Sequence, residues 1–257
     1  MKHFLAPLSF ILLLSTCKTE SPREIYSLTT YRLDTITQER LVDDYLSGAL
    51  IPALHRAGVR SVGVFKPAPV DTLAFGREIW VLIPHPSLKA FHQLNNTLLS
   101  DSTHLKQGKA YLEATHEQTP YRRMEVTLME AFTGMTTMET PTLTSPRPER
   151  IYELRSYEGP TEKRNRSKVK MFNDGDEIGL FRTLGFNSVF FGEVLAGNRM
   201  PNLMYMTTFD NMASRDEHWK QFFSHPHWKE LIEIEEYKHT VSKADIHLLT
   251  PTAYSDY

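Results

Sequence analysis

The stretch Ile25-Tyr26-Ser27-Leu28-Thr29-Thr30-Tyr31 alternates as a half-buried β-strand does, and the chain repeats this pattern. The second copy reads Ile151-Tyr152-Glu153-Leu154-Arg155-Ser156-Tyr157 and keeps Ile, Tyr, Leu and Tyr in the same places. The register holds further along, because the Gly, Ser and Val of residues 56–62 return in residues 183–189. In both copies the glycine follows a helical pattern, where it supplies a left-handed helix stop. The sequence therefore predicts a tandem duplication.

The duplication divides the chain into two predicted units. We place the first repeat at residues 24–139 and the second at residues 149–250. Residues 140–148 read Thr-Pro-Thr-Leu-Thr-Ser-Pro-Arg-Pro, which is the composition of a linker.

Each repeat is predicted to run strand, helix, strand, strand, helix, strand. In the first, Thr35 and Gln38 have capping-box spacing ahead of an amphipathic helix, in which Pro52 predicts a kink. In the second, helix is expected over residues 161–184, and Ser214 with Glu217 is expected to form another capping box. This order is that of a ferredoxin-like βαββαβ unit, so the predicted fold class is α+β.

Residues 203–209 predict how the two units associate. Both faces of this strand are largely apolar, which indicates helices on one side of its sheet and a second layer on the other. With two copies in one chain, the antiparallel sheets are expected to pack face to face as an α+β barrel of the dimeric α/β-barrel type. The space between the sheets would then be the place for a small ligand.

The first seventeen residues suggest an export signal. Lys2 and His3 precede an apolar run over residues 4–14 that is too short to span a bilayer, and Cys17 follows shortly after it. Residues 1–16 are predicted to be a signal peptide that ends in a lipobox-like sequence, with Cys17 lipidated. The chain would then be anchored to the periplasmic or outer face of a bacterial membrane in the cell envelope. The alternative is a secreted or periplasmic protein.

Composition excludes several classes of function. Lys and Arg number 29 against 31 Asp and Glu, so no basic excess points to nucleic acid. A single cysteine excludes an intramolecular disulfide and multi-cysteine metal sites. Phosphate-binding glycine loops and the Gly-x-Ser-x-Gly elbow are absent from the sequence. We predict no cofactor and no metal site. Whether the chain forms a homo-oligomer stays open.

The second repeat contains a set of residues that together form a family signature. They are Ile151-Tyr152-Glu153-Leu154-Arg155, Tyr157, Lys170-Met171-Phe172-Asn173, Leu184-Gly185-Phe186, Val189-Phe190-Phe191-Gly192-Glu193, Met200-Pro201-Asn202-Leu203-Met204-Tyr205-Met206, Arg215, Trp219, Phe222 and His225-Pro226-His227-Trp228. In these residues the second repeat resembles the NIPSNAP family, whose domain belongs to the dimeric α/β-barrel superfamily. The first repeat matches more loosely, through its Ile-Tyr-x-Leu-x-x-Tyr pattern and its order of elements. The resemblance implies the fold rather than a reaction, because the wider superfamily contains cofactor-free monooxygenases, haem degraders and haem peroxidases.

Tyr157, Glu193 and Tyr205 are the candidate catalytic or ligand-binding residues. They lie on predicted strands and combine two hydroxyls with a carboxylate. If they face the space between the sheets, Glu193 is placed to act as a general base or as a hydrogen-bond anchor. The alternative is that the tyrosines pack in the core and Glu193 lies in solvent.

Three other groups are interpreted as structural. The histidines His218, His225 and His227 lack metal-ligand spacing. A basic run is expected on a solvated helix face and consists of Lys163, Arg164, Arg166, Lys168 and Lys170. An aromatic group is expected to seal a core helix and consists of Trp219, Phe222, Phe223 and Trp228.

The sequence thus predicts a NIPSNAP-like protein that binds a small hydrophobic or mixed ligand between its sheets. One alternative is a cofactor-independent oxygenase or isomerase that uses Tyr157, Tyr205 and Glu193. Another is a non-enzymatic scaffold that captures partners through its helix faces.

Overall fold

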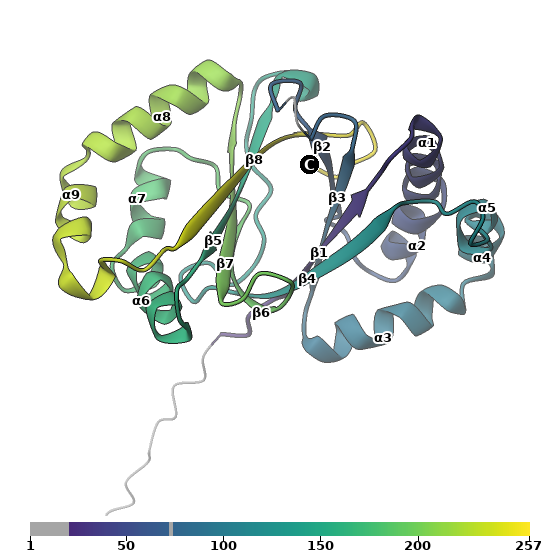
Figure 1. The fold of residues 1–257 in the computed structure, drawn as a ribbon, viewed down its shortest axis with the longest axis horizontal. Helices are drawn as coiled ribbons and strands as arrows, with labels where there is room; N and C mark the ends of the chain where they lie inside the picture. The colour runs from purple at the N-terminus through teal and green to yellow at the C-terminus, as the bar shows by residue number, and fades with distance from the viewer. Residues whose placement is uncertain (1–20, 72–73) are drawn as a thin grey trace, which may run out of the picture.

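The computed structural model describes residues 21–71 and 74–257, and its centre is a closed antiparallel β-barrel (Figure 1). Around the barrel the strands follow the order β1-β3-β2-β8-β5-β7-β6-β4. Their bounds are β1 Ile25–Arg32, β2 Gly63–Pro67, β3 Glu78–His85, β4 Arg123–Ala131, β5 Ile151–Glu158, β6 Phe190–Ala196, β7 Asn202–Phe209 and β8 Lys243–Pro251.

The two halves of the chain contribute four neighbouring strands each. The first half runs β4-β1-β3-β2 and the second runs β6-β7-β5-β8, which is the same order in both. Two short seams close the ring, because β2 pairs with β8 and β4 pairs with β6. The predicted α+β fold with two ferredoxin-like units is confirmed, and the two sheets also hydrogen-bond edge to edge.

The first-half helices lie on one side of the barrel (Figure 1). Thr35 caps α1 as predicted, since its hydroxyl accepts the N–H of Gln38 at 3.2 Å. A π-helical turn, Leu46–Leu50, lies between α1 and α2 and ends two residues before Pro52, which lacks an N–H for the helix ladder. The helices are α1 Ile36–Tyr45, α2 Ile51–Arg56, α3 Leu88–Leu99, α4 Ser102–Gln107 and α5 Lys109–Leu112.

The second-half helices differ from the sequence prediction in two places. The expected helix over 161–184 is two helices, because Asp176 takes a left-handed φ of 59° between them. The cap of the next helix is Asn211, whose side chain accepts the N–H of Ser214, so the predicted capping box of Ser214 and Glu217 is wrong. The helices are α6 Glu162–Asn173, α7 Glu177–Thr183, α8 Met212–Ser224 and α9 Pro226–Glu233.

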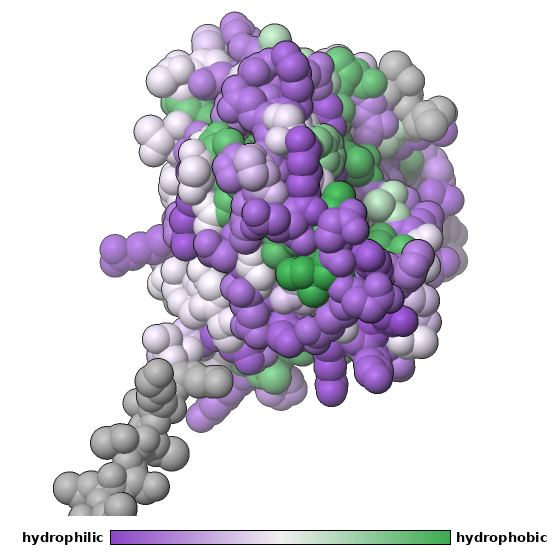
Figure 2. All heavy atoms as spheres, turned by 90° about the vertical axis from the view of Figure 1, so that its left-hand side faces the viewer, coloured by the Kyte–Doolittle hydropathy of each residue, from purple (hydrophilic) through white to green (hydrophobic). Residues whose placement is uncertain are grey.

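The outer surface of the second-half helices is solvated. Figure 2 shows this face as mostly hydrophilic, with hydrophobic patches between the polar side chains. Exposed apolar residues in this region include Phe223, Ile232 and Ile234. Within residues 21–71 and 74–257, no helix combines the length and the apolar character needed to cross a bilayer.

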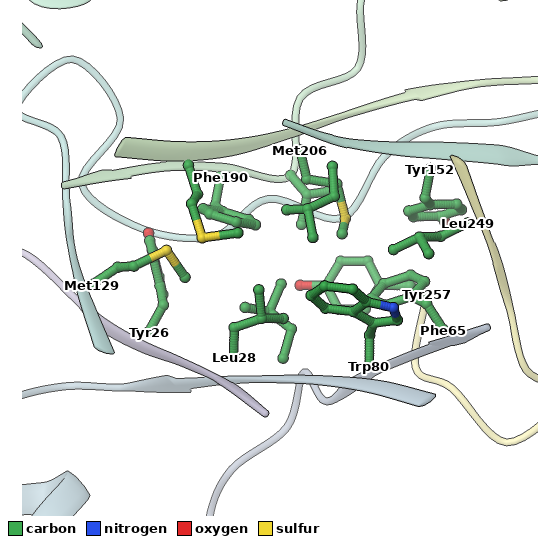
Figure 3. Packing of buried hydrophobic residues seen from close by; sticks show 14 of the residues in the cluster. Tyr26, Leu28, Phe65, Trp80, Met129, Tyr152, Phe190, Met206, Leu249 and Tyr257 are labelled. Atoms are coloured by element: carbon green, nitrogen blue, oxygen red, sulfur yellow. The ribbon is translucent and has the colours of Figure 1, made fainter. Parts of the chain in front are cut away.

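Side chains fill most of the barrel interior. Alternate residues of each strand point inward and meet across the barrel, as Figure 3 shows for Tyr26, Leu28, Trp80, Phe190 and Met206 among others. The opposite faces pack beneath the helices and form two further cores, one in each half. Both faces of β7 are buried, as the sequence predicts.

Candidate functional site

A small hollow lies at the end of the barrel, where β6 turns into β7. Its volume is about 40 Å³, which is room for about three water-sized groups. Polar side chains contributed by most of the strands surround it. The lining residues are Thr30, Arg32, Trp80, Glu125, Thr127, Ser156, Val194, Gly197, Asn198, Arg199, Asn202, Met204 and His247.

Two buried polar atoms at this hollow lack partners. The indole Nε1 of Trp80 and the amide Oδ1 of Asn202 make no hydrogen bond among the described residues. Trp80 is 5% exposed and Asn202 is 2% exposed, so bulk water does not compensate them. The Asn202 amide is oriented by Ser156, whose Oγ accepts its Nδ2–H at 2.8 Å. Because β3 and β7 lie on opposite sides of the ring, one donor and one acceptor face the hollow from opposite walls.

The cations at the opening already have carboxylate partners. Arg32 donates to Glu125 at 2.8 Å and also to Glu78. Arg199 pairs with Asp245 and lies 3.8 Å from Glu158. The opening therefore carries no uncompensated positive charge that would select an anion.

His247 forms part of the wall beside Trp80, with ring centroids 4.9 Å apart. Burial lowers the pKa of His247, so its imidazole is neutral at pH 7. A neutral imidazole offers one donor and one acceptor.

Tyr157 and Tyr205 lie on the other face of the sheet, beneath the second-half helices. Their hydroxyls are 2.9 Å apart, and Arg155 Nη1 donates to the Tyr157 hydroxyl at 2.9 Å. Tyr205 packs against Phe172 of α6 and Phe181 of α7. Burial raises the pKa of Tyr205 well above its usual value, so its hydroxyl stays protonated. The condition of the sequence hypothesis, that these side chains face the space between the sheets, is not met.

Glu193 lies on the same helix side but is separated from the tyrosine pair. Leu203 pairs with Glu193 on one side and with Tyr157 on the other, so its side chain lies between them. Asn165 of α6 donates to Glu193 at 3.4 Å. The structure thus brings the hydroxyls of Tyr157 and Tyr205 into hydrogen-bond contact, whereas Glu193 lies apart from this pair on the neighbouring strand β6.

A buried carboxylate that sequence reasoning missed organises this region. Glu153 is fully buried and accepts hydrogen bonds from Arg155 at 2.5 Å, from Arg215 at 2.5 Å and from the Trp219 indole at 3.0 Å. The Arg155 guanidinium also stacks over the Trp219 ring at 3.6 Å. The alternation of side chains along a strand places Glu153, Arg155 and Tyr157 on one face of β5. This pattern could have indicated the polar network from the sequence.

The basic run of α6 is only partly solvated, which corrects the sequence interpretation. Lys168 is buried and donates to Glu177 of α7 at 2.9 Å. Lys168 also lies 4.7 Å from the centre of the Phe172 ring. Of the aromatic residues predicted to seal a core helix, Trp219 and Phe222 of α8 are buried and Trp228 is partly buried, whereas Phe223 is 52% exposed, which corrects the prediction for that residue.

The three histidines make hydrogen bonds within the fold. The ring of His218 contacts the Ser214 carbonyl at 2.6 Å, His225 caps α9, and His227 contacts the Gly175 carbonyl at 2.8 Å. In the described parts of the chain, no group of three or more His, Cys, Asp or Glu has a geometry that would hold a metal ion. Cys17, the predicted lipidation site, lies outside the described residues.

Several solved structures share this fold. A candidate monooxygenase from Lactobacillus acidophilus NCFM is 11% identical, with coverage of 89% of this chain and 94% of that chain and a TM-score of 0.56. A candidate monooxygenase from Fusobacterium nucleatum subsp. nucleatum ATCC 25586 is 8% identical, with coverage of 89% and 92% and a TM-score of 0.56. An anthrone oxidase-like protein is 9% identical, with coverage of 90% and 92% and a TM-score of 0.51.

Identities this low show the fold alone. No curated protein matches the chain. The NIPSNAP family model matches residues 152–256, which contain β5 to β8, the helices that cover them and the Glu153 network. Residues 152–256 are therefore similar to the NIPSNAP family domain, within a chain that has an α+β barrel fold.

Proposed function

We propose that this chain binds a small, neutral polar molecule at the end of the barrel, between its sheets. The carrying observation is the pair of buried atoms without partners, Trp80 Nε1 and Asn202 Oδ1. Leaving such a group unsatisfied costs about 1–3 kcal/mol, and a ligand with one acceptor and one donor removes both penalties. Asn202 belongs to the NIPSNAP domain and Trp80 to the first half, so both repeats are needed for the site.

Size and charge define the ligand class. The apolar residues that fill the barrel leave room for only a few heavy atoms. Of the hydrophobic or mixed ligands expected from the sequence, we therefore propose a compact polar molecule. Arg32 and Arg199 are already paired, so an anion gains little there. A primary amide group has the required carbonyl acceptor and N–H donors.

Acetamide is the probe that tests this proposal. The chain has three tryptophans, and ¹⁵N-labelled protein therefore gives three indole N–H signals. We expect acetamide to shift the Trp80 signal and to leave the Trp219 signal in place, because the Trp219 indole already donates to Glu153. Trp80→Phe assigns the signal. Acetate has no N–H donor and methylammonium has no acceptor, so each is expected to shift the Trp80 signal less than acetamide does. A Trp80 signal that acetamide does not shift contradicts the proposal.

A second candidate function is a cofactor-independent oxygenase or isomerase, and two structural neighbours are named as candidate monooxygenases. It is favoured by the buried polar group of Arg155, Tyr157 and Tyr205, whose side chains are linked by two hydrogen bonds of 2.9 Å. Glu193 would be its general base. On a substrate found by screening, Glu193→Gln is expected to lower kcat about 100-fold, with exposed Glu113→Gln as the control. Unchanged turnover in Glu193→Gln removes Glu193 from the reaction.

We also propose that the mature protein is lipid-anchored at Cys17 in the bacterial cell envelope. The support is the order of a basic start, a short apolar run over residues 4–14 and a following cysteine. Membrane fractionation of cells that express the full chain or its Cys17→Ser variant tests this location.

A further inference from the structure

A second and larger cleft lies in the first half of the chain, away from the barrel end. It has a volume of about 540 Å³, within the usual range of small-molecule sites. Helix α3 forms one side, and its Leu94 and Leu98 are only partly buried against the first-half core. The cleft is lined by Glu24, Ala57, Gly58, Val59, Arg60, Ser61, Pro84, His85, Pro86, Ala90, Gln93, Leu94 and Thr97.

The duplication explains why this cleft exists. Gly58 and Gly185 both end a helix with positive φ, so Val59 corresponds to Phe186. In the second half Phe186 packs against Phe209 at 5.4 Å and against His218 at 5.5 Å between ring centroids, and Phe209 lies 5.5 Å from His218.

The corresponding residues of the first half are smaller and all line the cleft. Because α3 and α8 follow the third strand of their repeat and begin after Ser87 and Asn211, His85 and Leu94 correspond to Phe209 and His218. Val59, His85 and Leu94 together occupy less volume than two phenylalanines and a histidine. The space that these rings fill in the second half is therefore left open in the first half.

The lining of the cleft includes one deeply buried polar side chain. His85 is 2% exposed, and its Nε2 is 2.8 Å from the Ser27 hydroxyl. Burial lowers the pKa of His85 to about 4, so the ring is neutral at pH 7. Within residues 21–71 and 74–257 its Nδ1 makes no hydrogen bond, which leaves that nitrogen for a ligand. The ring also meets Phe91 edge-on, at 5.2 Å between centroids.

We propose that this cleft binds a neutral aromatic alcohol, whose hydroxyl bonds His85 and whose ring packs against Val59, Pro84 and Leu94. The charged residues of the lining are Glu24 and Arg60, one of each sign, so the cleft does not favour a charged ligand. The other contacts come largely from small apolar side chains, which suit a flat apolar body. This site is separate from the amide site of the barrel and does not depend on it.

The test is calorimetry at pH 7.5 with p-cresol, toluene and benzoate. We expect p-cresol to bind, toluene to bind at least fivefold more weakly because it lacks the hydroxyl, and benzoate to bind more weakly still. Two variants introduce the residue found at the equivalent position of the second half. His85→Phe introduces the equivalent of Phe209 and is expected to weaken p-cresol binding at least fivefold. Val59→Phe introduces the equivalent of Phe186 and is expected to abolish p-cresol binding.

Two controls fix the location and the integrity of the fold. Trp80→Phe changes the barrel end and is expected to leave p-cresol binding unchanged. Thermal unfolding of each variant verifies that it is folded. The proposal is overturned if wild type does not bind p-cresol, if folded His85→Phe and Val59→Phe bind it as wild type does, or if Trp80→Phe alone reduces binding.

Discussion

Glu153→Ala is expected to lower the free energy of unfolding by about 3–5 kcal/mol, because it leaves buried positive charge without its partner. Glu153 is fully buried and accepts from Arg155, Arg215 and the Trp219 indole. Its removal abolishes all three hydrogen bonds, and Arg155 is only 8% exposed and cannot turn to water. Urea unfolding followed by circular dichroism measures the loss.

Two companion variants make this result interpretable. Glu153→Gln keeps an acceptor for the indole but removes the charge, so we expect a smaller loss and a protein that still folds. Glu193→Ala is the matched control, because Glu193 is on the same side of the sheet with one long hydrogen bond of 3.4 Å, and we expect it to cost about 1 kcal/mol or less. Equal losses for Glu153→Ala and Glu193→Ala would show that Glu153 does not organise this core.

Lys168→Met is expected to cost about 3–5 kcal/mol at pH 7.5, because Glu177 then remains buried without a cation. Burial already raises the pKa of Glu177 in the native protein, and losing Lys168 removes the charge that opposes this shift. A carboxyl whose pKa is higher in the folded state binds more protons there than when unfolded. Stability of the variant relative to wild type should therefore rise as the pH falls toward the unfolded value of about 4.3.

The double variant Lys168→Met/Glu177→Leu provides the control for this pair. It has no unpaired charge, so most of the lost stability is expected to return and the added pH dependence to disappear. Denaturant titrations at pH 5 and pH 7.5 measure both effects. A single variant that is as stable as wild type at both pH values contradicts the assignment of a buried ion pair.

The repeat made most of the fold predictable from sequence. The matching strands β1 and β5 and the glycines at 58 and 185 fix the order of elements in both halves. The exact bounds of the second-half helices were not predictable in the same way. The break in the second-half helix depends on the left-handed Asp176, a conformation that sequence periodicity does not report.

The direction of the tyrosines was not predictable, and β5 shows why. Alternation says that Tyr152 and Leu154 share one face and that Arg155 and Tyr157 share the other. Both faces of β5 are buried, one in the barrel and one beneath the helices, so the pattern does not say which face meets which layer. The polar barrel end was missed for another reason, because its lining comes singly from strands far apart in sequence.

The most direct test of the barrel site is calorimetric titration of acetamide at pH 7. Affinity should be weak, because a fragment gains at most about 1.5 kcal/mol for each heavy atom. We predict that Trp80→Phe, which removes the indole donor and keeps an aromatic ring, weakens binding about five- to tenfold, the effect of one lost hydrogen bond. Trp228→Phe makes the same chemical change on helix α9 and should leave the affinity unchanged. Equal affinity in wild type and Trp80→Phe, or no binding of acetamide by wild type, would contradict a polar ligand site between the two sheets.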